Sequence, residues 1–104
     1  MSLNIERWDE AKLGPFSRQK MLEKLQCEGY QTTVYTFGPG TVFGDHSHSV
    51  SKKDAILGGR FLFRMGGEEV TLEQGDQLEV PAGETHYAAC VGSEPVTFVD
   101  ASKC

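Results

Sequence analysis

The sequence predicts an all-β domain, a small barrel or sandwich of short strands preceded by a single helix. From residue 31 onward, about seven or eight short runs rich in β-branched and aromatic residues are separated by turns, roughly every 8 to 12 residues. Twelve of the 104 residues are glycine, and several stand in pairs or beside proline or aspartate, where tight turns are expected. Hydrophobic residues make up 38% of the chain, which suits the modest core of one small domain.

The first 30 residues predict an N-terminal arm followed by the helix. Residues 1–16 contain one large apolar anchor, Trp8, and are expected to be extended. Ser17 is a suitable N-cap, and three apolar residues after it recur at helical spacing. These residues are Met21, Leu22 and Leu25. We expect the helix to run to about Cys27, with that thiol buried, and to stop at Gly29.

The pattern of residues 31–104 predicts the strands of the domain. The expected strands cover residues 32–37, 41–48, 54–65, 68–73, 78–80, 86–91 and 96–100. The run at 54–65 is long for one strand, and the glycine pair at 58–59 lets the backbone bend or turn there. Because no repeat or linker marks a second domain, residues 1–30 and 31–104 are expected to form one unit.

All three histidines fall in two short segments. Residues 40–48 read G-x5-H-x-H, and residues 75–86 read G-x5-P-x-G-x2-H. Side chains two apart on a strand share a face, so His46 and His48 would point the same way, roughly 7 Å apart. Neutral imidazole is a good ligand for Zn, Fe, Cu and Ni, so a metal site is predicted if His86 meets this pair.

The two segments resemble the two signatures of the cupin superfamily, at the spacing of its small single-domain members. The second signature fits without a gap at Gly75, Pro81, Gly83 and His86. The resemblance covers about residues 30–101 and implies a small, jelly-roll-like β-barrel with the two signatures on neighbouring strands. It also implies that His46, His48 and His86 bind one divalent metal ion inside the barrel.

Two positions depart from the pattern of that family. Cupins commonly place a glutamate ligand shortly after the second histidine of the first signature, where this chain has Lys52 and Lys53. Asp54 shares a strand face with Lys52 and is expected to act as the acidic ligand if the register shifts. The alternative is a three-histidine site with Lys52 nearby, its charge paired, for example by Asp54, or its pKa lowered. Cys90 stands where an asparagine usually ends the second signature.

Lys52 and Cys90 are also candidates for the wall of a substrate pocket. A lysine that points into the barrel would attract a carboxylate from a small acidic ligand. Cys90 shares strand parity with His86 but lies about 13 Å further along, too far for a metal ligand. The sequence favours packing for Cys90 over contact with a substrate.

The resemblance implies Fe, Zn, Mn or Ni as the metal, and it offers dioxygenases, isomerases and decarboxylases as precedents. The fold does not select among these reactions, and whether any reaction occurs is left open. One alternative is a non-catalytic or sensory module that holds a small ligand. Another is a barrel whose metal site has lapsed.

Composition and charge exclude several classes of protein. The formal net charge of −5 argues against nucleic-acid binding, and no apolar stretch is long enough to span a membrane. The N-terminus has no basic-then-apolar signal pattern, so a cytoplasmic location is expected. Three cysteines without C-x2-C spacing do not indicate a disulfide framework. Exposed sheet edges favour a homodimer, with Trp8 or the arm in the contact.

Overall fold

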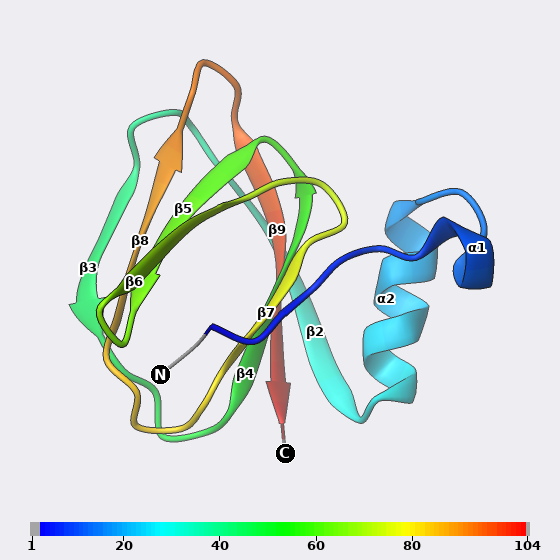
Figure 1. Cartoon of the computed structure of the whole chain (residues 1–104), viewed down its shortest axis with the longest axis horizontal. Helices are drawn as coiled ribbons and strands as arrows, with labels where there is room; N and C mark the ends of the chain where they lie inside the picture. Colours follow the sequence, from blue (N-terminus) through cyan, green and yellow to red (C-terminus); the bar gives the residue numbers. More distant parts are fainter. Residues whose placement is uncertain (1–2, 104) are drawn as a thin grey trace.

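The computed structural model describes residues 3–103 and shows two antiparallel sheets that face each other, with helices beside one of them (Figure 1). In chain order the elements are β1 (Ile5–Glu6), α1 (Glu10–Leu13), α2 (Arg18–Cys27), β2 (Tyr30–Phe37), β3 (Val42–His46), β4 (Lys52–Gly58), β5 (Arg60–Met65), β6 (Glu68–Leu72), β7 (Gln77–Val80), β8 (His86–Val91) and β9 (Val96–Lys103). The five-stranded sheet has the order β1-β7-β4-β9-β2, and the four-stranded sheet has the order β3-β8-β5-β6. The predicted all-β fold is confirmed, although the two sheets do not close into a continuous barrel.

The main hydrophobic core lies between the two sheets. It is built from alternate residues of each strand, because side chains along a strand point to opposite faces. Its buried members are Ile56, Phe61, Phe63, Met65, Leu72, Leu78, Val80, Ala88, Cys90, Val96 and Phe98. This inner core holds the inner faces of the sheets together and leaves a cavity toward the histidine segments.

A second, smaller cluster covers the outer face of the five-stranded sheet. Met21 and Leu25 of α2 are fully buried there against Ala55, Val99 and Ala101. Together, the four-stranded sheet, the five-stranded sheet and the helix make three layers (Figure 1).

The glycine pair at 58–59 forms a turn. The stretch at 54–65 is therefore two strands: β4 ends at Gly58 in one sheet, and β5 begins at Arg60 in the other. Gly59 has a φ of +83°, and a Cβ atom there would lie 2.4 Å from the carbonyl oxygen of Pro95. Only glycine fits this crossing between the sheets.

The predicted helix is confirmed, with Ser17 as its N-cap: the Ser17 side chain accepts a hydrogen bond from Lys20 N. Its last residue is Cys27, whose side chain is exposed, so the expectation of a buried thiol was wrong. Gly29 follows with a φ of +93°, as a helix stop requires. No helix within residues 3–103 has the length and apolar character needed to cross a bilayer.

The N-terminal arm is less extended than the sequence suggested. Asp9 accepts hydrogen bonds from the backbone of the next turn and caps the short helix α1, so the described N-terminal residues form two helices, α1 and α2, where one was predicted. Strand β1 pairs with β7 and covers one edge of the five-stranded sheet. Trp8 packs edge-on against Phe16 and donates a hydrogen bond to Gly14 O, so it anchors the arm on its own chain.

Candidate metal centre

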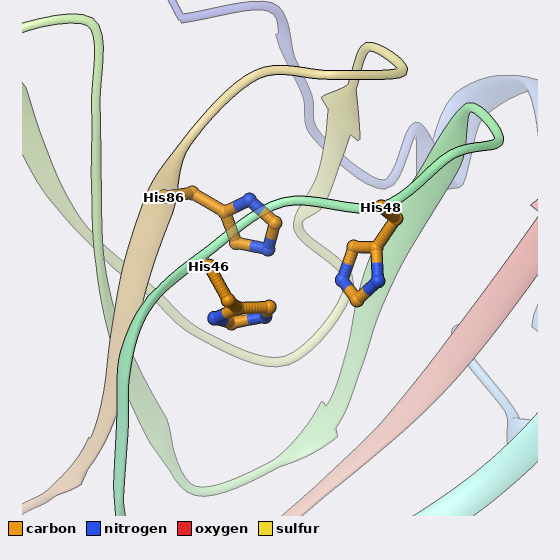
Figure 2. Close-up of side chains that lie close together, drawn as sticks. All are labelled: His46, His48 and His86. Atoms are coloured by element: carbon orange, nitrogen blue, oxygen red, sulfur yellow. The ribbon is translucent and has the colours of Figure 1, made fainter.

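The register between β3 and β8 brings the histidines of the two segments together. His46, the last residue of β3, lies opposite His86, the first residue of β8. His48 lies two residues beyond the end of β3, and its carbonyl accepts a hydrogen bond from Gly83 N. Ring centroids are separated by 4.2 to 5.1 Å, and the potential ligand atoms lie within 4.8 Å of one another. Figure 2 shows the three rings close together, converging from two different segments.

An irregularity in β3 decides which way His46 points. Phe43 lies opposite Ala88 and His46 opposite His86, so three steps along β3 match two along β8. Such an extra residue is a β-bulge, and it reverses the side-chain alternation beyond it. Both Phe43 and His46 therefore line the same cavity, although their spacing gives them opposite parity. The histidines meet as predicted, but through this bulge and a loop position for His48.

Backbone carbonyls fix the tautomer of two of the imidazoles. His46 Nδ1 lies 2.6 Å from Gly44 O, and His86 Nδ1 lies 3.0 Å from Glu84 O. Because a carbonyl oxygen can only accept, each Nδ1 carries the proton and donates it. Each Nε2 then presents a lone pair, as a metal ligand must.

Packing and burial hold His86 in its neutral form. It is 3% exposed, and its ring lies parallel to the buried ring of Phe63, with 5.3 Å between centroids and 6° between planes. Burial is the main cause that lowers the pKa of His86; the hydrogen bond to Glu84 O opposes it, and the charges of His46 and Lys52 add to it. Burial followed by Lys52 also lowers the pKa of His48. Both shifts favour the neutral imidazole that binds metal ions.

The histidines line a cavity of about 220 Å³ between the sheets. Six aromatic side chains form most of the rest of its wall: Tyr35, Phe37, Phe43, Phe61, Phe63 and Phe98. Phe37 and Phe61 both stack on Phe98, with centroids 6.0 and 4.9 Å apart. Tyr35 is 42% exposed, so the aromatic wall reaches the surface there. This aromatic part of the wall is apolar, which strengthens electrostatic interactions inside the cavity.

Three charged side chains of the five-stranded sheet line the same cavity. Lys52 Nζ donates to both carboxylate oxygens of Asp100, at 3.1 and 3.0 Å. Asp54 lies opposite Asp100 in the strand register. Burial, then repulsion by Asp100, raise the pKa of Asp54 to about 7, while Lys52 acts in the opposite direction. The charge of Lys52 is therefore paired, as one alternative required, but Asp100 rather than Asp54 forms the ion pair.

The predicted site residues occupy different places. Within residues 3–103, the group of potential ligands that lie together consists of the three histidines, and Asp54 is outside it. Asp54 and Lys52 both line the cavity. Cys90 is buried in the inner core, where its pKa is raised by burial, and it is not among the residues that line the cavity.

Sequence reasoning missed Asp100 and the full extent of the aromatic wall. Asp100 is 48 residues from Lys52, and only the pairing of β4 with β9 brings the two together. The sequence did contain a signal for the aromatic wall: by their spacing, Phe61 and Phe63 share one strand face, and Tyr35 and Phe37 share another. Alternation could not reveal that both pairs face the histidines.

The donor set fits a divalent metal ion. Three imidazoles, two of which direct Nδ1 to a backbone carbonyl and leave Nε2 for a metal, suit Zn, Fe and Ni, whereas Mn usually takes more oxygen ligands. Three protein ligands are also the common number where a metal keeps positions for water or substrate.

Several solved structures have a similar fold. They include a conserved protein of unknown function from Streptococcus pyogenes (23% identity, TM-score 0.64), which matches over 72% of this chain and 64% of that one. A predicted oxalate decarboxylase from Thermotoga maritima has 22% identity and a TM-score of 0.65, over 78% of this chain and 72% of that one. A structure of DMSP lyases has 25% identity and a TM-score of 0.66, over 72% of this chain and 38% of that one. The chain thus spans under two thirds of the streptococcal protein and well under half of the lyase.

Sequence comparison defines the family. No curated protein matches the chain. The cupin domain matches residues 33–102, which is well over half of the chain and includes all three histidines. With this match, and with the histidines of both signatures brought together where β3 pairs with β8, the chain belongs to the cupin family.

Proposed function

We propose that this cupin is a metal-dependent enzyme for a small molecule, with one divalent ion held by His46, His48 and His86. The observation that carries the proposal is the convergence of these three side chains on one side of an aromatic cavity. A set of imidazoles beside a cavity is the usual arrangement of a catalytic metal site with room for a ligand.

The residues around the cavity have distinct roles in this proposal. The three imidazoles bind the ion, and the carbonyls of Gly44 and Glu84 keep two of them in the right tautomer. The aromatic wall excludes water from a bound substrate. When bound, the ion supplies Lewis-acid polarisation of an oxygen ligand, and iron would add oxygen chemistry.

Known cupins support small-molecule chemistry in this architecture. Solved structures with the same fold include proteins described as a predicted oxalate decarboxylase and as DMSP lyases. The three histidines by themselves favour Zn, Fe or Ni over Mn. Asp54 as a fourth ligand remains a prediction, which loss of metal from Asp54→Asn would support.

The test is elemental analysis of untagged protein purified without chelators, together with His46→Ala and His86→Ala. We expect about one metal ion per chain in the parent. In either variant the affinity for the metal should be weaker by about 100-fold. Tyr87→Phe is the matched control, because Tyr87 is next to His86 on β8 but packs under Arg64. That control should keep its metal.

Stability gives a second readout that does not depend on finding the substrate. Metal at 100 times its dissociation constant should raise the free energy of unfolding by about 2.7 kcal/mol in the parent and in Tyr87→Phe, but not in His46→Ala. A parent that holds no metal as purified and takes up none on reconstitution would contradict the proposal and indicate a lapsed site. If the protein holds metal but turns over none of a set of small carboxylates, a binding module without catalytic activity would be the better description.

A further inference from the structure

Lys52 puts a positive charge into the cavity that is proposed to hold a divalent cation. It is the first residue of β4, four positions after His48, and it lines the same cavity as the three histidines. Its charge reaches the histidine group: after burial, which is the larger cause, Lys52 contributes to the lowered pKa of both His48 and His86. Like charges repel more strongly beside an apolar wall than in water. A free ammonium group here would therefore weaken the binding of a metal ion.

The carboxylate of Asp100 offsets that charge. Lys52 Nζ donates to both of its oxygens, at 3.1 and 3.0 Å, and the two side chains are only 18% and 24% exposed. In the register of β4 and β9, Asp100 lies opposite Asp54 and Lys52 opposite Ser102, so the ion pair runs diagonally between the strands. Burial and Lys52 lower the pKa of His48, whereas Asp100 raises it. The two charges thus act in opposite directions on the same imidazole.

The ion pair is not needed to join its two strands. The backbones of β4 and β9 pair in register from Lys52 to Ile56, and apolar residues of both strands are buried under α2. A partly buried ion pair is also weak evidence for stability, because the cost of desolvation offsets its attraction. What the pair does change is the charge beside the histidines.

We propose that Asp100 sets the affinity of the histidine site for its metal by cancelling the charge of Lys52 beside the ion. Asp100 is a positioning residue rather than a ligand: among the described residues it lies outside the histidine group, and it acts by holding the ammonium group. The inference rests on the proposed function, because it concerns the metal that the histidines hold. It requires the two members of one ion pair to change the metal affinity in opposite directions.

The test is a titration of metal-free protein with Zn²⁺ in competition with a chelating dye. Asp100→Asn keeps the shape of the side chain and leaves Lys52 charged, so the affinity should fall by about 10- to 100-fold. Lys52→Met removes the charge and leaves Asp100 ionised, so the affinity should rise above that of the parent. The double variant restores neutrality and should bind almost as the parent does. Asp54 stays in every variant, so a ligand role for it would not differ between them.

Two control variants make the same changes of net charge on the opposite face of the sheet. These are Lys53→Met and Glu28→Gln, whose side chains pair with each other there. Neither residue lines the cavity, so neither change should alter the affinity for Zn²⁺ appreciably. Circular dichroism checks that each variant is folded, and Lys52→Gln and Asp100→Ser are the second choices where one is not.

The outcomes separate the inference from the proposed function. Weaker binding in both Lys52→Met and Asp100→Asn would overturn the inference and make the pair a structural one. Equal affinities in the parent and both variants would also overturn it, while the proposed function would stand. If the parent takes up no metal, the proposed function is contradicted and the inference with it.

Discussion

Lys52 and Lys53 are neighbours in the chain, yet they serve opposite faces of the five-stranded sheet. Lys52 pairs with Asp100 in the cavity. Lys53 is only 4% exposed and donates to Glu6 and Glu28 on the other face, beside α2. Strand alternation explains why two identical residues have such different surroundings, and only the cavity lysine bears on the metal centre.

Asp54 should make the protein less stable as pH rises. Its pKa is about 7 in the folded state against an ordinary value of 3.8, so ionisation disfavours folding. The loss of folding stability that ionisation of Asp54 causes is absent below about pH 4. It grows between about pH 4 and pH 7 and is complete above about pH 7. Asp54→Asn removes it, so the variant should exceed the parent in stability by about 2–4 kcal/mol at pH 8.

The measurement is urea unfolding of both proteins, stripped of metal, from pH 4 to pH 8. The groups that face Asp54 are Asp100 and Lys52, and both are retained in the variant. The stability difference between variant and parent should rise with pH and then level off. A difference that stays flat would mean that the carboxyl group titrates normally.

The histidine group could be predicted at this scale, and the partners of the charged residues could not. Local spacing within two motifs identifies His46, His48 and His86, and this spacing can be read without knowing how distant strands pair. The Lys52–Asp100 pair depends on the register of two strands far apart in sequence. No local pattern encodes it.

Among the elements, β3 contributes most to the site, through its bulge. With regular alternation at the present spacing of three residues, His46 would fall on the face opposite to Phe43 and away from the cavity. Sequence patterns rarely reveal a bulge, because the alternation they rely on is what the bulge interrupts. Helix α1 was missed for a related reason, since four residues are too few to show a helical period.

Deleting Gly44 should remove the bulge and still leave His46 facing the cavity. The deletion brings Phe43 and His46 two positions apart, and two steps along β3 then match two along β8, so regular alternation keeps both side chains on the inner face. The matched control is Gly44→Ala, which keeps the length of the bulge; a Cβ atom there would meet nothing within 4 Å. Metal titration should show binding in both variants. Loss of binding in the deletion alone would mean that the bulge itself, and not the face of the strand, positions His46.

Over the whole molecule, the N-terminal segment is joined to the sandwich by charge as well as by strand pairing. Glu6 of β1 and Glu28 beyond α2 both accept hydrogen bonds from Lys53 and form ion pairs with Lys24. Hydrogen bonds from the two lysines outweigh burial and lower the pKa of both glutamates. The network fixes the arm over the sheet edge at β7.

Replacing Lys53 should therefore cost more than a surface lysine usually does. Lys53→Ala leaves Glu6 and Glu28 with half of their cationic partners, and we expect a loss of about 2–3 kcal/mol in the free energy of unfolding. Lys12→Ala, at an exposed position on α1, should change it by less than about 0.5 kcal/mol. Urea unfolding at pH 7 gives both values. Similar losses in the two variants would show that the network adds little.

The molecule leaves long strand edges open, and we propose a homodimer on that ground. Strand β2 has eight residues and stands at the edge of its sheet, and β3 is an edge of the other. Trp8 is already packed against Phe16 within the chain, which makes β2 a better contact than the arm. Sedimentation velocity at micromolar concentration should show a dimer, and a monomer there would contradict the proposal.

The strand order also determines when the protein can assemble during synthesis. Strand β9 is the last of the strands and lies between β4 and β2, so it supplies the neighbour for both. The five-stranded sheet cannot be completed until residue 103 has left the ribosome, although β2 is made some 60 residues earlier. Nascent chains stalled before β9 should therefore stay sensitive to protease and depend on chaperones, and refolding of the full chain should be slow for its size.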